Sequence, residues 1–239
     1  MKTLGVILAR AGSKGLPRKN ALPLAGRPMI AWTVQHARQS ASLSRYLVST
    51  DGEELASIAR DAGAEVILRP PELAHDTATV DAAARHALEQ AEAEAGETFD
   101  AVVILYGNVP LRPADLTDRA VAKLARTGCD SVQSVCPVGK MHPYWMKQLA
   151  GDAGDVLEPW VENQVYRRQD LPPVYMLDGG IIAVTRASLL TTAPDQPHAF
   201  LGRDRRAVVT EPGEVVDVDT ATDLRVAEAI LADRGGQES

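Results

Sequence analysis

The stretch LGVILARAGSKGLPRKN, at residues 4–20, decides the fold of this chain. It opens with a continuous apolar run at residues 4–9, which is typical of a strand buried on both faces of a sheet. Gly12 and Gly15 follow among basic residues, so the strand leads into a loop. In an open parallel sheet, ligands bind beyond the carboxyl ends of the strands. The stretch therefore predicts a parallel α/β sheet with a binding loop after its first strand.

The rest of the chain alternates between strand and helix signals. Runs that predict further strands lie at residues 46–49, 64–68, 101–105, 130–135, 178–184 and 214–218. Between them, helical patterns cover residues 28–41, 55–62 and 79–95, and further helices start at Pro113 and near Thr220. Thr50 with Glu53, and Thr220 with Asp223, have the spacing of a capping box. This alternation predicts an α/β fold with a doubly wound, mostly parallel sheet.

One segment differs in composition from the remainder of the domain. We expect residues 1–239 to form a single domain with an inserted arm or subdomain at about residues 137–175. Proline is frequent there, and the segment holds five of the chain's eight Trp and Tyr residues, namely Tyr144, Trp145, Trp160, Tyr166 and Tyr175. It is either a long loop packed on the main core, a dimer interface or a cover over the acceptor substrate, since aromatic residues are enriched at both of the latter surfaces.

Bulk composition excludes several classes of function. The 239 residues carry 25 Lys and Arg against 32 Asp and Glu, a net charge of −7, which repels nucleic-acid phosphates. The two cysteines, Cys129 and Cys136, give neither a disulfide framework nor a zinc spacing. The apolar run near Met1 is too short for a signal peptide or a bilayer span. We expect a cytoplasmic protein with no nucleic-acid partner and no membrane association.

The loop after the first strand suits the phosphates of a nucleotide. Its glycines let backbone N–H groups turn toward an anion. The glycine spacing matches neither the dinucleotide fingerprint nor the P-loop pattern. The loop also gathers polar side chains within a short stretch, namely Arg10, Ser13, Lys14, Arg18, Lys19 and Asn20. The alternative interpretation is a solvated basic surface loop.

A pair of carboxylates lies near the C-terminus, in Val216-Asp217-Val218-Asp219-Thr220. On a strand, residues at i and i+2 point to the same face. Like charges at that distance are unfavourable unless a cation or donor lies between them. Asp217 and Asp219 are therefore candidate ligands for Mg²⁺, which prefers a few carboxylates with phosphate oxygens and waters. The alternative is that Asp219 only caps the last helix while Asp217 is solvated.

These motifs together resemble those of the acylneuraminate cytidylyltransferases. Residues 9–20 match the family signature, roughly A-R-x-x-S-K-G-[IL]-P-x-K-N, at each fixed position. Residues 48–51 (VSTD) and 69–77 (RPPELAHDT) are similar to V-S-T-D and R-P-x-x-L-A-x-D, and residues 217–220 (DVDT) to D-[IV]-D-T. The resemblance covers nearly the whole chain. It implies a Rossmann-like nucleotidyltransferase fold, a Mg²⁺ cofactor and a homodimer.

The resemblance also implies roles for single residues. CTP would be bound by Arg10, Ser13, Lys14, Lys19 and Asn20. Arg10 and Lys14 would hold phosphates, while Lys19 would stabilise charge on the α-phosphate as pyrophosphate leaves. Arg69 would lie near the cytosine, and His75, where the family varies, would be an ordinary surface residue. The catalytic set would be Arg10, Lys19, Asp217 and Asp219, the last two as metal ligands.

The match weakens in the half that would bind the acceptor. Residues 105–112 read LYGNVPLR where the family has L-Q-P-T-S-P-L-R, which places Tyr106 at the sugar-contacting glutamine and Asn108 nearby. Residues 166–172 (YRRQDLP) fit R-R-Q-x-L-P and carry over Arg168 and Gln169, whereas Asp178 lies in MLDGGII, which departs from R-x-N-G-x-I-Y. We expect these five residues to bind a modified or different 2-keto-3-deoxy acid.

The resemblance therefore implies a cytidylyltransferase that joins CTP to sialic acid or a related nonulosonic acid, releasing pyrophosphate. The same chemistry on another 2-ulosonic acid, such as an eight-carbon one, is the near alternative. A non-catalytic nucleotide-binding relative is the alternative from a different class. The sequence does not decide the general base.

Overall fold

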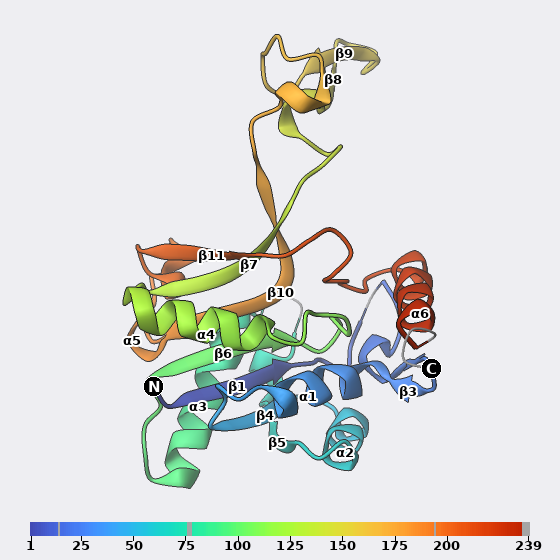
Figure 1. Cartoon of the computed structure of the whole chain (residues 1–239). Helices are drawn as coiled ribbons and strands as arrows, with labels where there is room; N and C mark the ends of the chain where they lie inside the picture. The colour runs from blue at the N-terminus through green and yellow to red at the C-terminus, as the bar shows by residue number, and fades with distance from the viewer. Residues whose placement is uncertain (14, 76–77, 194, 236–239) are drawn as a thin grey trace.

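A computed structural model describes residues 1–13, 15–75, 78–193 and 195–235. Within them, one large sheet has the strand order β11-β7-β10-β6-β1-β4-β5 (Figure 1). Neighbouring strands are parallel, except that β10 is antiparallel to both β6 and β7. The mostly parallel, doubly wound sheet is thus confirmed. Its strands are β1 (Thr3–Leu8), β4 (Arg45–Thr50), β5 (Glu65–Leu68), β6 (Ala101–Tyr106), β7 (Ser131–Pro137), β10 (Tyr175–Thr185) and β11 (Arg205–Val209).

Helices cover both faces of this sheet (Figure 1). One face packs against α1 (Met29–Gln39), α2 (Glu53–Asp61) and α4 (Leu116–Thr127). The other face packs against α3 (Val80–Ala95) and α5 (Arg186–Leu189). The last helix, α6 (Ala221–Gly235), packs beside the short strands β2 (Pro23–Leu24) and β3 (Arg27–Pro28). Apart from the short α5, which the sequence did not predict, these helices agree with the sequence prediction to within a few residues at the ends that were predicted.

The first strand lies at the centre of the sheet because both of its faces are apolar. Leu4, Val6 and Leu8 pack toward α3, whereas Ile7 packs toward α1, α2 and α4. Burying each such side chain contributes about 1.5–3 kcal/mol. Between them, Gly5 leaves room for a neighbour, since a Cβ there would lie 2.8 Å from Leu43 Cδ1. The strand's carboxyl end, and the loop that follows it, are thereby fixed at one edge of the sheet.

The sequence prediction was wrong about the last strand. Residues 214–218 form only an isolated bridge, between Val216 and Leu111, because they run along the loop after β6. The real last strand, β11, was missed because its first two residues, Arg205 and Arg206, interrupt any apolar run. β11 is an edge strand, so one side of its backbone has no neighbouring strand.

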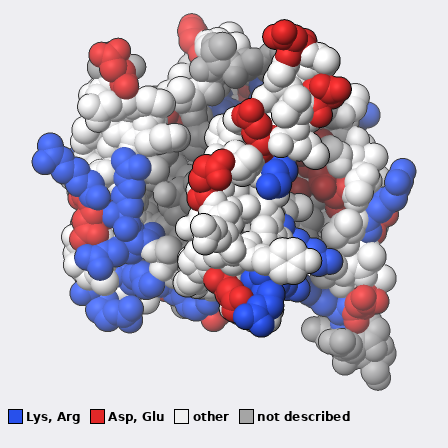
Figure 2. Space-filling view, turned by 90° about the horizontal axis from the view of Figure 1, so that it is seen from above, with Lys and Arg blue, Asp and Glu red and all other residues white. Residues whose placement is uncertain are grey.

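Basic side chains protect this edge. Lys123 Nζ of α4 donates to the carbonyl of Ala207 at 2.5 Å, and Arg119 Nη1 donates to that of Val209 at 3.3 Å. On the face of the molecule seen from above, Lys and Arg side chains gather at the left and lower left (Figure 2). Charged edge strands resist pairing with another chain. Arg205 and Arg206, which made β11 difficult to recognise in the sequence, therefore have a structural role.

Only one of the two predicted capping boxes forms. Thr220 Oγ1 accepts from the N–H of Asp223 at 3.3 Å, and Asp223 Oδ2 accepts from the N–H of Thr220 at 2.8 Å. At α2 the N-cap is Gly52, without a side-chain cap. Thr50 belongs to β4, and its hydroxyl accepts instead from the N–H of Gly52 at 3.3 Å. Thr50 therefore remains part of the strand, and the helix begins two residues beyond the position that Thr50 could cap.

The chain between β7 and β10 projects from the sheet as an arm, defined as residues 138–174 (Figure 1). Within it, β8 (Lys147–Ala150) and β9 (Val156–Pro159) pair as an antiparallel hairpin. His142 is buried and holds the arm's turn, since its Nδ1 accepts from the N–H of Tyr144 at 3.1 Å. Trp160 and Tyr166 are 63% and 91% exposed, so these two aromatic side chains do not pack on the main core.

No helix within the described residues has both the length and the apolar character needed to cross a bilayer.

The buried His36 of α1 gives a pH-dependent contribution to stability. Its Nε2 lies 2.8 Å from Thr117 Oγ1 of α4. Burial, aided by the charge of Arg112, lowers the pKa of His36 from 6.5 to about 3, with Asp118 opposing the shift. As the pH falls below 6.5, His36 of the unfolded chain therefore binds a proton, whereas His36 of the folded protein stays neutral until about pH 3. This contribution is complete above that pH and is lost as the pH falls toward 3.

We predict that His36→Gln flattens the pH dependence of stability between pH 6.5 and 4. For each unit by which the pH is lowered, the free energy of unfolding of the wild type should fall by up to about 1.4 kcal/mol more than that of the variant. Each pKa unit corresponds to that free energy. Urea denaturation at several pH values measures both slopes. Parallel stability profiles for the two proteins would contradict the neutral, buried state of His36.

Candidate active site

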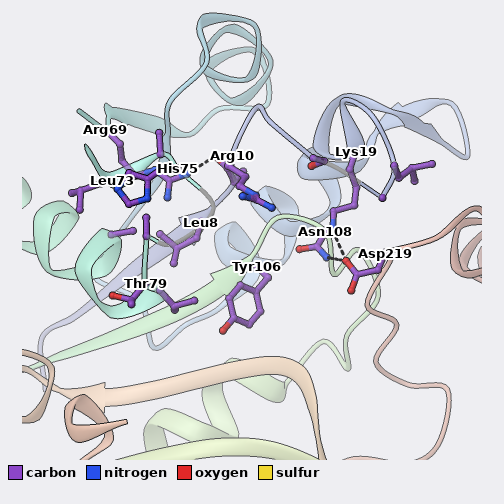
Figure 3. Close-up of a pocket in the computed structure, with 18 residues that line it drawn as sticks. Leu8, Arg10, Lys19, Arg69, Leu73, His75, Thr79, Tyr106, Asn108 and Asp219 are labelled. Carbon is purple, nitrogen blue, oxygen red and sulfur yellow. Dashed lines mark hydrogen bonds and ion pairs between the residues drawn. The ribbon is translucent and has the colours of Figure 1, made fainter. Parts of the chain in front are cut away.

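A cavity of about 390 Å³ opens at the carboxyl ends of β1 and β6 (Figure 3). Its walls are formed by the loop after β1, by residues within 69–75 and 78–83, and by the residues that end β6. Asp219 reaches it from the segment before α6. The polar residues that line it are Arg10, Ser13, Lys19, Arg69, His75, Thr79, Tyr106, Asn108 and Asp219. The sheet edge predicted to bind a ligand thus carries a cavity.

The basic side chains of the loop after β1 do not all face the cavity. Arg10, Ser13 and Lys19 line the cavity, whereas Arg18 forms an ion pair with Glu54. Arg18 has a left-handed backbone, with φ 55°, and Lys19 begins the short helical turn η1 (Lys19–Ala21) directly after it. This reversal of the chain separates the two neighbouring cations.

One described residue of the predicted nucleotide set, Asn20, stands apart from the cavity lining. Asn20 is buried behind the loop, where its Nδ2 donates to the carbonyl of Arg10 at 3.1 Å. It therefore supports the position of Arg10 from behind. Lys14 lies outside the described residues, as do Asp76 and Thr77.

An ion pair between Arg69 and Asp51 clamps the start of the loop. Arg69 Nη2 donates to the carbonyl of Ala9 at 3.0 Å, and Asp51 Oδ1 accepts from the N–H of Ala11 at 2.9 Å. The two side chains lie 3.7 Å apart and are 7% and 18% exposed. Burial lowers the pKa of Arg69, while the charge of Asp51 opposes the shift. Sequence reasoning assigned Arg69 to the nucleotide but gave Asp51 no role.

Sequence reasoning largely missed the part of the wall that residues 73–75 and 78–80 form. Leu73, His75, Thr79 and Val80 line the cavity (Figure 3). Thr79 also caps α3, since its hydroxyl accepts from the N–H of Ala82. His75 is exposed, as expected, but it faces the cavity and is not an ordinary surface residue. Its position, a few residues beyond the end of β5 at the binding edge, was the signal available in the sequence.

The carboxylates of Asp217 and Asp219 lie close together opposite the basic loop. Asn108 Nδ2 donates to Asp217 Oδ1 at 2.5 Å and to Asp219 Oδ1 at 3.3 Å. Lys19 Nζ donates to the same Asp219 Oδ1 at 2.5 Å (Figure 3). Val218 between them is fully buried, so the expected alternation holds even though the segment is not a strand.

Burial, together with charge in this cluster, shifts two pKa values. Partial desolvation, followed by the charge of Asp219, raises the pKa of Asp217 to about 6, although Lys19 and Arg112 counteract this. Burial and the charge of Asp217 raise the pKa of the Tyr106 phenol. Tyr106 therefore keeps its proton at neutral pH and remains a hydrogen-bond donor.

The two carboxylates fit a magnesium ion better than a metal held by protein alone. Within the described residues, no three His, Cys, Asp or Glu side chains are arranged to hold a metal ion. Mg²⁺ is usually bound by one or two carboxylates, with the remaining positions filled by water and substrate phosphates. The donor set of Asp217 and Asp219 beside a cationic loop matches that description.

Three of the five predicted acceptor residues lie away from the cavity lining. Asp178 is engaged internally: its Oδ1 accepts from Ser134 Oγ and its Oδ2 from Thr210 Oγ1. Arg168 and Gln169 lie on the arm in the turn η4 (Arg168–Asp170), and both are exposed. The other two, Tyr106 and Asn108, line the cavity.

The chain matches one family model and is similar in sequence to the two relatives described here. The family model described as cytidylyltransferase matches residues 4–175. The CMP-N,N'-diacetyllegionaminic acid synthase of Legionella pneumophila is 31% identical over 97% of this chain and 97% of its own length. The N-acylneuraminate cytidylyltransferase of Streptococcus agalactiae serotype III is 35% identical over 94% of this chain. The chain spans about half of that longer relative, 52%.

A solved structure has the same fold. The CMP:2-keto-3-deoxy-manno-octonic acid synthetase complexed with CTP matches with a TM-score of 0.73, over 98% of this chain and 100% of that one, at 20% identity. With a family model that covers most of the chain and a full-length relative above 30% identity, the chain belongs to the cytidylyltransferase family.

Proposed function

We propose that this chain transfers a cytidylyl group from CTP to sialic acid or a related acidic nonulosonic sugar, giving a CMP-sugar and pyrophosphate. The observation that carries this proposal is the cavity itself, which brings the basic loop and Asp219 within hydrogen-bond distance of one another. The two nine-carbon-sugar synthases described above support the choice of acceptor. We also propose that the enzyme acts in the cytoplasm, where CTP is formed.

The cavity has two ends with different chemistry, and CTP would lie across them. Arg10, Ser13 and Lys19 would hold the phosphates, since cations and a hydroxyl converge there. The mixed wall that includes Arg69 and Thr79 would receive the cytosine and ribose. The Asp51–Arg69 clamp keeps the loop in place before the nucleotide arrives, which reduces the ordering that binding requires.

In the reaction, the anomeric hydroxyl oxygen of the sugar attacks the α-phosphorus of CTP. The new P–O bond forms as the bond to the β-phosphate oxygen breaks, so pyrophosphate departs and the hydroxyl proton is released. Lys19 would offset the charge that develops on the α-phosphate oxygens. Asp217 and Asp219 would hold Mg²⁺, which supplies Lewis-acid polarisation and a template for the two reacting groups.

The acceptor end favours a sugar different from common sialic acid. Tyr106 replaces the glutamine expected there and offers a protonated phenol. The relative from Legionella pneumophila is described as acting on a diacetylated legionaminic acid, which is a substrate of the expected modified type. An eight-carbon acid is the alternative, since a synthetase for such an acid shares the fold. A non-catalytic relative is disfavoured, because the described residues keep both the basic loop and the carboxylate pair.

We further propose that the arm forms a homodimer. Its hairpin leaves Leu149 and Leu157 68% and 69% exposed in the single chain, and adjacent exposed apolar side chains mark protein interfaces. Arg168 and Gln169 lie on the same arm, away from the cavity of their own chain. A dimer would reconcile their expected role in sugar binding with that position, if they reach the partner's cavity.

The reaction is tested by pyrophosphate release from purified protein with Mg²⁺. Each of the four ribonucleoside triphosphates is offered with a panel of nonulosonic and octulosonic acids. We expect release with CTP and a nine-carbon acid only. Pyrophosphate release with an eight-carbon acid alone would show that such an acid is the acceptor instead. Absence of CTP binding would refute the proposed reaction.

The carboxylate pair is tested by Asp217→Asn. We predict that kcat falls by at least about 100-fold, because metal-based charge stabilisation is worth several kcal/mol and each 1.4 kcal/mol is a factor of ten in rate. The control is Asp61→Asn, which removes an exposed carboxylate at the end of α2 and should leave kcat unchanged. Equal activity of both variants would contradict a role for Asp217.

The dimer is tested by placing charges in the hairpin. The double variant Leu149→Lys with Leu157→Lys should weaken association at least about 30-fold, because central interface residues contribute about 2 kcal/mol or more. Light scattering after size-exclusion chromatography measures the mass. Val226→Lys, which changes an exposed apolar residue of α6, serves as control. A monomeric wild type would contradict the proposal.

A further inference from the structure

The Lys19 ammonium and the Asn108 side-chain amide donate hydrogen bonds to the carboxylates of Asp217 and Asp219. Asp219 Oδ1 accepts from Lys19 Nζ at 2.5 Å and from Asn108 Nδ2 at 3.3 Å. The same Asn108 Nδ2 donates to Asp217 Oδ1 at 2.5 Å. These donors compensate the two like charges, which would otherwise repel each other. Any cation that binds between the carboxylates must compete with the Lys19 ammonium for Asp219 Oδ1.

Lys19 and Asn108 differ in how firmly they are held at this position. Asn108 is tied by its backbone, since its carbonyl accepts from the N–H of Val218 at 2.9 Å, and its side chain also donates to the carbonyl of Val218 at 3.3 Å. Lys19 contacts the pair only through the end of its long side chain, which is 15% exposed. Lys19 can therefore leave Asp219 without moving the backbone, whereas Asn108 cannot.

The cavity offers Lys19 a second anionic partner once a nucleotide binds. Lys19 lines the same wall as Arg10 and Ser13, where the triphosphate would lie. A triphosphate carries more negative charge than one carboxylate, so it attracts the ammonium more strongly at equal distance. Departure of Lys19 toward the phosphates uncovers Asp219 Oδ1 while phosphate oxygens arrive to complete a metal's coordination.

We propose that Lys19 is a surrogate cation in the free enzyme and couples metal binding to triphosphate binding. In the free protein its ammonium neutralises Asp219 and suppresses metal binding. With the nucleotide present, Lys19 exchanges Asp219 for phosphate, and the metal takes its place. Asn108 remains as a positioning residue that keeps the two carboxylates together during the exchange. This inference rests on the proposed binding of a nucleoside triphosphate, but not on the identity of the sugar.

Direct Mn²⁺ binding tests the exchange without any turnover. Electron paramagnetic resonance of free Mn²⁺ measures its affinity for the protein alone and with CTP, after subtraction of the Mn²⁺–CTP complex. Lys19→Gln should bind Mn²⁺ at least about tenfold more tightly than wild type when no nucleotide is present, because a repelling charge is removed. Its gain in affinity on adding CTP should be smaller, and by linkage its CTP affinity should respond less to Mn²⁺.

Two further variants make the comparison specific. Arg18→Gln removes the neighbouring positive charge of the same loop, but Arg18 is paired with Glu54, so its Mn²⁺ affinity should remain close to wild type. Lys19→Arg keeps the charge and should keep Mn²⁺ binding weak. Circular dichroism and thermal melting confirm that each variant is folded.

The proposal is overturned if Lys19→Gln binds Mn²⁺ with unchanged or weaker affinity than wild type in the absence of nucleotide. Equal tightening by Arg18→Gln would also overturn it, since the effect would then come from net charge and not from the contact with Asp219. Failure of the wild type to prefer CTP over other triphosphates would count against the proposed function alone. The comparison of the free proteins would still decide the role of Lys19.

Discussion

The geometry of the site depends on the buried guanidinium of Arg112. Arg112 donates to the carbonyls of Gly180 (2.6 Å), Tyr106 (3.0 Å) and Val109, and to Thr33 Oγ1 (3.1 Å). Burial lowers its pKa to about 9, against the charges of Asp217 and Asp178, so it is still charged at neutral pH. A buried charge is tolerated only when its hydrogen bonds are satisfied, and the planar fork of arginine matches this set of acceptors where lysine would not.

Because Arg112 fixes the chain on both sides of Asn108, it determines where the carboxylates lie. It joins the end of β6 to α1 and to Gly180, which lies in the irregular middle of β10. Asn108 then joins that loop to Asp217 and Asp219 through its side chain, and to Val218 through its backbone. On the opposite wall, Arg69 and Asp51 hold the basic loop in a similar way. Thus each half of the cavity has an internal arginine that positions it.

The sequence predicted what is local and apolar, and it missed what depends on long-range contacts. The buried central strands and their crossover helices were predictable because hydrophobic periodicity reports them directly. β11 was not, because an edge strand stabilised by Lys123 and Arg119 needs no apolar run. Most of the polar residues that line the cavity were among those that the motifs indicated. Asp51, Arg112 and the support given by Asn20 were missed, because their partners are backbone groups that no sequence pattern displays. Arg168 and Gln169 lie on the predicted arm, but their separation from the cavity of their own chain follows only from the three-dimensional path of the chain.

The contact between Lys19 and Asp219 joins residues 200 positions apart. During synthesis, Lys19 therefore leaves the ribosome long before Asp217 and Asp219 do. Until these carboxylates emerge, Lys19 and Asn108 lack the side-chain partners that they have in the folded protein. The packing of α6 against Leu24 and Met29 then brings both parts of the chain together. The contact can therefore form only in a chain that contains both segments, so a fragment that lacks either one cannot complete this cluster.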